Sequence, residues 1–309
     1  MSLVLIKDIF AGVGTYDAWS LQLIKINNSR RDGTSYLTRD VEFSPNGKIA
    51  SFLKEVAEGY IKPDKGTLSK YQDVREYDGT SIDRVVYTLD SDNELIKTEY
   101  EALIGAIAAP DGELDPLSMK AQAYLIKGLV TIGDEQHSVK FISMQKPVTN
   151  LKHKFLRSSG TFREINEQVI SLRSSIDVII YDNKIYMLTL AGENLFNMER
   201  AYKATCNCKV DEVKAIGIIS DPDSFSNIAC NGHNPRKFVS FNEKRLEKLK
   251  NANTRKKVSR QFDIPMNGDQ FDTSTPEASD KLIKVLCNRG MMDPFEDNPV
   301  EVDGSKKWE

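Results

Sequence analysis

The segment Ile176–Leu190, with the sequence IDVIIYDNKIYMLTL, restricts the fold of this chain more than any other feature. Two apolar runs rich in β-branched residues flank Asp182 and Asn183. Asparagine tolerates the positive φ that a two-residue hairpin turn requires. The segment therefore predicts a tight β-hairpin.

Strand and helix patterns occur on both sides of this hairpin. Strands are predicted from β-branched and aromatic enrichment, and helices from apolar residues spaced three and four apart. The predicted strands are Trp19–Ile26, Asp83–Leu89, Ala121–Val130 and Ser138–Met144, the last two joined as a hairpin through Gly133 and Asp134. The predicted helices are Ile49–Tyr60, Glu99–Ala108, Asn194–Met198, Lys209–Ile219, Phe241–Lys257 and Pro276–Asn288. The fold class is α+β, with mixed or antiparallel strands and a helical C-terminal half around the β-hairpin.

The length of 309 residues predicts two domains, since one hydrophobic core rarely serves a chain this long. We expect an N-terminal α/β domain over residues 1–150 and a C-terminal domain over residues 151–309. No apolar run approaches the roughly 20 residues that cross a bilayer. The N-terminal sequence MSLVLIKDIF lacks the features of a signal peptide. Together with only four cysteines, expected to be reduced, these features predict a cytoplasmic protein.

The charge is distributed unevenly along the chain. Residues 1–150 carry 17 basic and 22 acidic side chains, whereas residues 151–290 carry 23 and 17. The densest basic segment runs from Arg236 to Arg260 and has two acidic residues, Glu243 and Glu247. Its ten cations are Arg236, Lys237, Lys244, Arg245, Lys248, Lys250, Arg255, Lys256, Lys257 and Arg260.

This basic segment predicts a nucleic-acid-binding surface. On one continuous helix, Lys244, Lys248 and Arg255 would share a face, with Leu246 and Leu249 on an apolar stripe. A row of cations binds phosphates through counterion release, without base-specific contacts. A second basic run, Lys140–Arg163, has no acidic residue and contributes Lys152, Lys154 and Arg157 to the predicted surface. The alternative is a solvated charged face that pairs with the acidic stretch Asp73–Asp115.

The string REINEQVISLRSSIDVIIYDNKIYMLTLAGENLFNME, residues 163–199, resembles the KwaB-like family of the Kiwa anti-phage system. The shared features are the apolar segment Ile176–Tyr181, the polar turn, the run Lys184–Leu188, and a following helix with Asn194, Phe196 and Glu199. The resemblance extends through AQAYLIKGLV and HSVKFISMQKPV, and through VLCNRGMMDPFEDNPVEVDGSKKW near the C-terminus.

The resemblance implies a non-enzymatic, DNA-binding component that acts with KwaA, a small multi-pass membrane protein, to restrict phage replication or expression. It further implies a homodimer or higher homo-oligomer, recruited to the inner membrane face by its partner. No cofactor is expected. A protein-only adaptor is an alternative function.

A metal-dependent nuclease is another alternative function. Asp177 followed by Asp182, Asn183 and Lys184 loosely matches the carboxylate pattern that holds Mg²⁺ in nucleases. The turn position of Asp182 and Asn183 argues against a metal pocket, because their side chains would project from the hairpin tip. Glu212 and Lys214 repeat the spacing, but within a predicted helix.

Two further features have alternative interpretations. Cys206, Cys208, Cys230 and His233 could supply four zinc ligands, but a C-x-C pair need not converge, so separate reduced thiols are favoured. The acidic tail Asp293–Asp303 could imitate phosphates and dock on a basic surface of this or another chain. A solvated terminus is the favoured interpretation of that tail.

Overall fold

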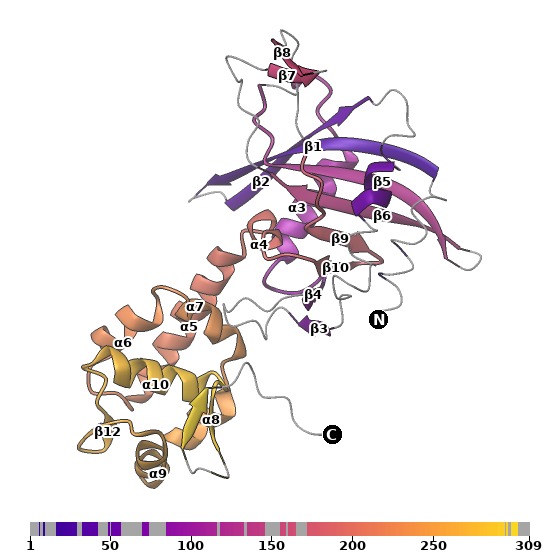
Figure 1. Ribbon diagram of the computed structural model, residues 1–309. Coiled ribbons are helices and arrows are strands. Elements are labelled where there is room, and N and C mark those ends of the chain that lie inside the picture. The colour runs from indigo at the N-terminus through magenta and orange to yellow at the C-terminus, as the bar shows by residue number, and fades with distance from the viewer. Residues whose placement is uncertain are drawn as a thin grey trace. The chain divides into compact units, whose positions relative to one another are not determined.

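The structure is a computed structural model that divides into two compact units (Figure 1). One unit comprises Met1–Tyr71 and Asp83–Asn197, and the other comprises Gln72–Ile82 and Met198–Glu309. The residues that the structure describes are 6, 9, 17–29, 33–42, 49, 51–56, 70–73, 85–115, 118–132, 135–145, 155–158, 160–164, 172–293, 295 and 298–301. Both helices and antiparallel strands are present, which confirms the α+β fold class.

An eight-stranded sheet with the order β2-β1-β5-β6-β9-β10-β4-β3 dominates the first part of the chain. One face of the sheet carries alternating buried side chains such as Leu21, Leu23, Tyr124, Phe141 and Ile179, as the two-residue period of a strand requires. The strands are β1 Asp17–Ser29, β2 Gly33–Val41, β3 Lys70–Asp73, β4 Val85–Asp90, β5 Ala123–Ile132, β6 Glu135–Met144, β9 Val178–Tyr181 and β10 Lys184–Met187.

The predicted hairpin over Ile176–Leu190 is confirmed as strands β9 and β10. Asp182 and Asn183 have φ of 48° and 56°, which is the left-handed conformation of a tight two-residue turn. The hairpin pairs with β6 on one side and β4 on the other, so it lies inside the sheet. Its apolar runs are buried there. The hairpin therefore belongs to the first unit, which ends at Asn197, whereas the predicted domain boundary was at residue 150.

The second predicted hairpin is also present, since β5 and β6 pair from Ala123 with Met144 to Ile132 with Glu135. Its turn residues, Gly133 and Asp134, lie outside the described part of the chain. The predicted helix before Pro110 is α3, Lys97–Ala108. Thr38 of β2 donates from Oγ1 to the Ala106 oxygen of α3 at 2.6 Å, which ties this helix to the sheet edge.

Smaller elements complete this unit. A helix over residues 51–56 buries Leu53 and Val56, in agreement with the helical pattern predicted from Ile49. Strands β7, Phe155–Ser158, and β8, Thr161–Glu164, form a separate two-stranded ribbon. The short helix α4, Gly192–Leu195, follows the hairpin.

The second unit is mostly helical, with small ribbons between the helices. Its core includes Val210, Phe225, Phe238, Leu249 and Leu282. The elements are α5 Met198–Ile216, α6 Pro222–Ala229, α7 Asn234–Lys237, η4 Phe238–Ser240, α8 Glu243–Leu249, α9 Ala252–Phe262, β11 Met266–Asn267, β12 Gln270–Phe271, α10 Pro276–Leu286, β13 Gly290–Met292 and β14 Pro299–Glu301. Within the described residues, no helix is both long and apolar enough to cross a membrane.

The prediction of one continuous helix over Phe241–Lys257 is wrong. Asn242 caps α8 by accepting from the Arg245 backbone N–H at 3.1 Å. Asn251 then caps α9 by accepting from the backbone N–H groups of Asn253 and Thr254. Asparagine favours such N-cap positions because its side-chain oxygen satisfies otherwise unpaired N–H groups. The predicted helix is therefore split into α8 and α9 (Figure 1), while Arg236 and Lys237 of the basic segment lie on α7.

Candidate nucleic-acid interface

Helices α8 and α9 present a group of exposed cations. Lys244 and Lys248 lie four residues apart on α8, opposite the buried Leu246. Lys257 and Arg260 lie three residues apart on α9 and are also exposed. Among the residues that the structure describes, none of these four cations forms an ion pair, so their charge faces solvent.

Two arginines that the sequence assigns to the surface instead bind helix ends. Arg255 donates from Nη1 to the Leu249 and Lys250 oxygens, both at 2.8 Å, and from Nε to the Asp269 oxygen at 2.6 Å. The two bonds from Nη1 satisfy carbonyls at the C-terminus of α8. The prediction that Arg255 shares a helix face with Lys244 and Lys248 is therefore wrong, because a helix end separates them.

Arg245 has the same kind of role at α10. Its Nη1 donates to the Val285 oxygen at 2.6 Å, in the last turn of that helix. A cation at this position also interacts favourably with the helix dipole. Burial lowers the pKa of the Arg245 guanidinium below its usual range. Arg245 is thus half-buried and directed into the unit rather than away from it.

The remaining cations of the segment have partners within the same unit. Lys237 lies 3.3 Å from Asp280 with only 12% of its side chain exposed, and Arg236 stacks over the Tyr202 ring at 4.9 Å. Lys256 pairs with Asp269 at 2.9 Å. Lys250 pairs with Glu247 at 2.6 Å, an exposed pair of the kind that contributes little to stability.

Most cationic side chains of the second basic run lie outside the part of the chain that the structure describes. Lys152 and Lys154 are not described, and Arg157 is described only by its backbone in β7. Lys140 lies on β6 directly opposite Lys127 of β5. Burial, followed by the charge of Lys127, lowers the pKa of Lys140. Whether this run joins the cations of α8 and α9 stays a prediction.

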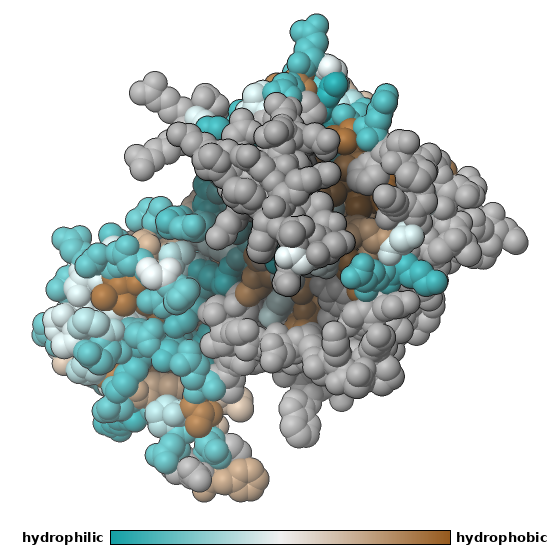
Figure 2. Space-filling view, turned by 45° about the horizontal axis from the view of Figure 1, so that its top comes forward, coloured by the Kyte–Doolittle hydropathy of each residue, from teal (hydrophilic) through white to brown (hydrophobic). Residues whose placement is uncertain are grey.

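The surface of the second unit is largely hydrophilic in the view of Figure 2, with small apolar areas between polar ones. One hollow in this surface adjoins Lys248. Its apolar side chains include Val258 and Phe262, which lie four residues apart on α9, with Thr254 one turn before them. In the sequence, these three side chains recur at a helical spacing of four residues. The charged residues between them make this spacing hard to recognise.

The candidate nuclease carboxylates do not come together. Asp177 is buried and accepts from the Met144 backbone N–H at 2.8 Å and from the Thr189 hydroxyl at 2.5 Å. Asp182 is exposed at the hairpin tip, where Lys184 pairs with Asp90 at 3.4 Å. The turn interpretation of Asp182 is confirmed, and Asp177 is a structural link between β6 and the end of β10.

The cysteine cluster is only partly assembled. Cys206 Sγ lies 3.8 Å from Cys230 Sγ, whereas Cys208 and His233 are exposed. Burial, and then the neighbouring Cys230, raise the pKa of the Cys206 thiol, which opposes the thiolate form that metals bind. Burial likewise raises the pKa of Cys287 to about 12. Within the described ranges, no group of three or more His, Cys, Asp or Glu side chains could hold a metal ion.

Part of the acidic tail contacts the same unit. Glu301, on β14, lies 2.8 Å from Lys284 Nζ and 4.0 Å from Lys237 Nζ. Strand β14 pairs with β13 from Gly290 to Met292, which fixes this carboxylate near α10. Glu301 therefore shares Lys284 and Lys237 with Asp280, which pairs with both lysines.

These observations define a class of protein: an α+β chain whose helical unit exposes unpaired cations on two short helices. A family model described as "Kiwa protein KwaB-like" matches residues 119–292, which is more than half of the chain. The chain therefore belongs to the KwaB-like family and is a component of Kiwa anti-phage defence. The match includes the two predicted hairpins, β5–β6 and β9–β10, and the basic helices. No curated protein and no solved structure matches the chain.

Proposed function

We propose that this chain is a non-enzymatic DNA-binding component of Kiwa defence that restricts phage replication or expression. The exposed cations Lys244, Lys248, Lys257 and Arg260 carry this proposal, because they lack carboxylate partners among the described residues and lie on adjacent helices. Cations in this state can release the counterions of a phosphate backbone. We further propose that a KwaA-like membrane protein recruits the chain, as a homo-oligomer, to the inner membrane face.

The proposed contacts are sequence-independent. Lysine side chains on a helix surface bind phosphates as point charges and carry no base pattern. The affinity for DNA should therefore be similar across sequences and should fall steeply with salt.

The experiment is a DNA titration of the full chain at several salt concentrations, followed by fluorescence anisotropy. The test variant combines Lys244→Glu, Lys248→Glu and Lys257→Glu, because these exposed side chains have no structural partners among the described residues. Loss of three phosphate contacts should reduce the slope of log affinity against log salt by about three. Arg255 is left intact, because its substitution would disturb α8.

The matched control combines Arg200→Glu, Lys203→Glu and Lys214→Glu on α5. It changes the net charge by the same amount within the same unit. We expect it to retain most of the salt slope. An equal loss of binding in both variants, or an unchanged slope in the test variant, would contradict the proposed surface.

The same preparation tests the two alternative functions. Supercoiled plasmid incubated with the protein and Mg²⁺ or Mn²⁺ should remain uncut. Nicking that disappears with Asp177→Ala or Asp182→Ala would establish a nuclease instead. A protein-only adaptor would fail to bind DNA at low ionic strength while it still formed the complex with its membrane partner.

A further inference from the structure

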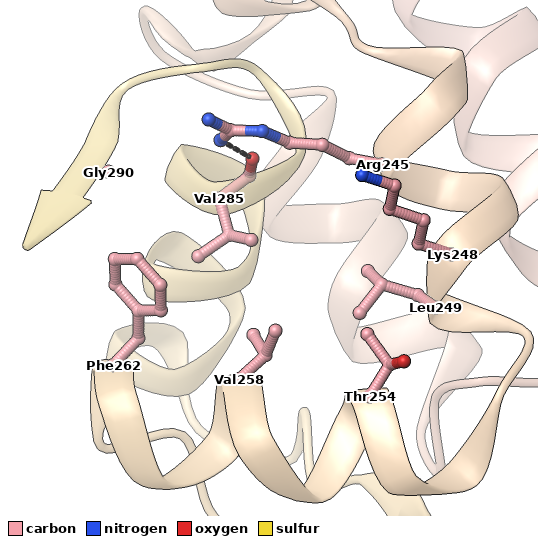
Figure 3. Close-up of a pocket in the computed structure, with 8 residues that line it drawn as sticks. All are labelled: Arg245, Lys248, Leu249, Thr254, Val258, Phe262, Val285 and Gly290. Carbon is pink, nitrogen blue, oxygen red and sulfur yellow. Dashed lines mark hydrogen bonds between the residues drawn. The ribbon is translucent and has the colours of Figure 1, made fainter.

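A hollow of about 250 Å³ opens beside the exposed cations, where α8, α9, α10 and β13 meet (Figure 3). Its walls come from two pairs of neighbouring elements, α8 with α9 and α10 with β13, which are separated in the chain by residues 263–275. Leu249 of α8, Val258 and Phe262 of α9, and Val285 of α10 project into it, and Gly290 of β13 lies at its edge. The hollow is therefore a product of tertiary packing.

The chemistry of this hollow is amphipathic. Apolar side chains and the Phe262 ring form its walls, while Arg245 and Lys248 extend along one side and Thr254 adds a hydroxyl (Figure 3). Apolar walls beside cations fit a ligand that has a flat apolar body and an anionic attachment. Among the described residues that line this hollow there is no carboxylate, so they offer a cationic ligand no counter-charge.

The position of the Phe262 ring requires a glycine at residue 290. A Cβ added at Gly290 would lie 3.1 Å from Phe262 Cε1, closer than ordinary packing allows. The absence of a side chain at residue 290 therefore lets the ring lie against β13. There the Phe262 side chain remains half-buried.

Lys248 connects the hollow to the surface that we assign to phosphates. It lines the hollow, and Lys244 lies one helical turn before it on α8. A phosphate held by these two lysines would bring the attached base to the mouth of the hollow. Bases present a flat π-face that stacks on aromatic side chains whatever their sequence.

We infer that this hollow receives an unstacked base of a DNA strand, so that the surface binds unpaired strands in preference to paired ones. The inference rests on the proposed DNA binding and deepens it, because it names single-stranded DNA or an unpaired strand end as the ligand class. The hollow adds base stacking to a backbone contact that is itself independent of sequence.

The experiment compares three DNA probes on the full chain. They are a 20-nucleotide single strand, the same strand with every base replaced by an abasic residue, and a blunt duplex of the same sequence. The abasic strand keeps the phosphates and lacks the bases. We expect the natural strand to bind about tenfold tighter than the abasic one, the scale of one stacked base.

Two variants then locate the effect. Val258→Phe fills the hollow without changing the charge. It should reduce the affinity for the natural strand to that for the abasic strand. Gln261→Ala changes an exposed side chain of α9 that does not line the hollow and should keep the preference. Circular dichroism checks that both variants retain the helical fold, and the probe comparison on the unaltered chain does not depend on either variant.

The outcomes separate this inference from the proposed function. Equal binding of natural and abasic strands would overturn base insertion while DNA binding stands. Failure of all three probes to bind at low salt would overturn the proposed function itself. If Val258→Phe still prefers the natural strand to the abasic strand, the hollow does not bind a base. The same conclusion follows if this variant loses the membrane partner while its DNA binding is unchanged.

Discussion

Arg255 and Lys257 are two residues apart, yet they have opposite roles. Arg255 donates three hydrogen bonds to backbone oxygens, two of them at the end of α8. Lys257 is exposed and has no such bond among the described residues. At the residue scale, a cation is available to a binding surface only when it is exposed and is not already bonded to other groups of the protein.

This difference gives a prediction about the two positions. Arg255→Gln should lower the free energy of unfolding by about 2 kcal/mol, because charged hydrogen bonds to backbone oxygens are lost. Lys257→Gln should change that free energy by less than about 0.5 kcal/mol and reduce the salt slope of DNA binding by about one. Urea denaturation and salt-dependent titration measure the two effects. Equal destabilisation by both variants would contradict these roles.

The β9–β10 hairpin shows how local chemistry acts at the scale of an element. Asp182 and Asn183 both adopt positive φ, and the flanking apolar runs are buried between β6 and β4. The turn thus fixes the register of two central strands, with Lys184 opposite Tyr181. A residue that resists this conformation should weaken the whole sheet.

Substitution of Asn183 tests this role of the turn. Asn183→Val should lower the free energy of unfolding by about 1–2 kcal/mol, since β-branched side chains are disfavoured in the left-handed region. Asn183→Gly should cause no comparable loss, because glycine has no Cβ to clash there. Urea denaturation of both variants is the measurement. If the valine variant is as stable as the glycine variant, the turn does not control the hairpin.

At the scale of the whole molecule, the net charge of −3 conceals a separation of charge along the chain. The helical unit carries the exposed cations, and its acidic C-terminal strand brings Glu301 to Lys284 and Lys237. The carboxylate reduces the positive charge near α10. The tail therefore acts as a partial screen on the helical unit.

Removal of this carboxylate should strengthen DNA binding. Glu301→Gln should raise the affinity by about two- to fivefold at low salt, the scale of an exposed ion pair, and the gain should vanish at high salt. Glu199→Gln on α5 is the control, because it also removes a carboxylate paired with a lysine, Lys203. An equal gain in both variants would indicate an effect of net charge alone.

Much of the fold could be predicted from the sequence because its signals are local. The alternation of residues 176–190 and the turn residues Asp182 and Asn183 identify a hairpin without reference to the rest of the chain. The same is true of β5, β6, α3 and α10. The strand pattern could not predict which strands lie next to the hairpin, because its pairing with β6 and β4 involves residues far away in the sequence.

The sequence by itself determined the α+β class, the hairpins, the density of cations over residues 236–260 and the resemblance to the KwaB-like family. Only the tertiary structure decided which cations remain exposed, because their partners are distant: Arg245 binds the Val285 oxygen, Arg255 binds the Asp269 oxygen, and Lys237 lies near Glu301. Composition counts charges without their partners. Packing assigns the partners, and it also created the hollow beside Lys248, whose walls four separate elements supply.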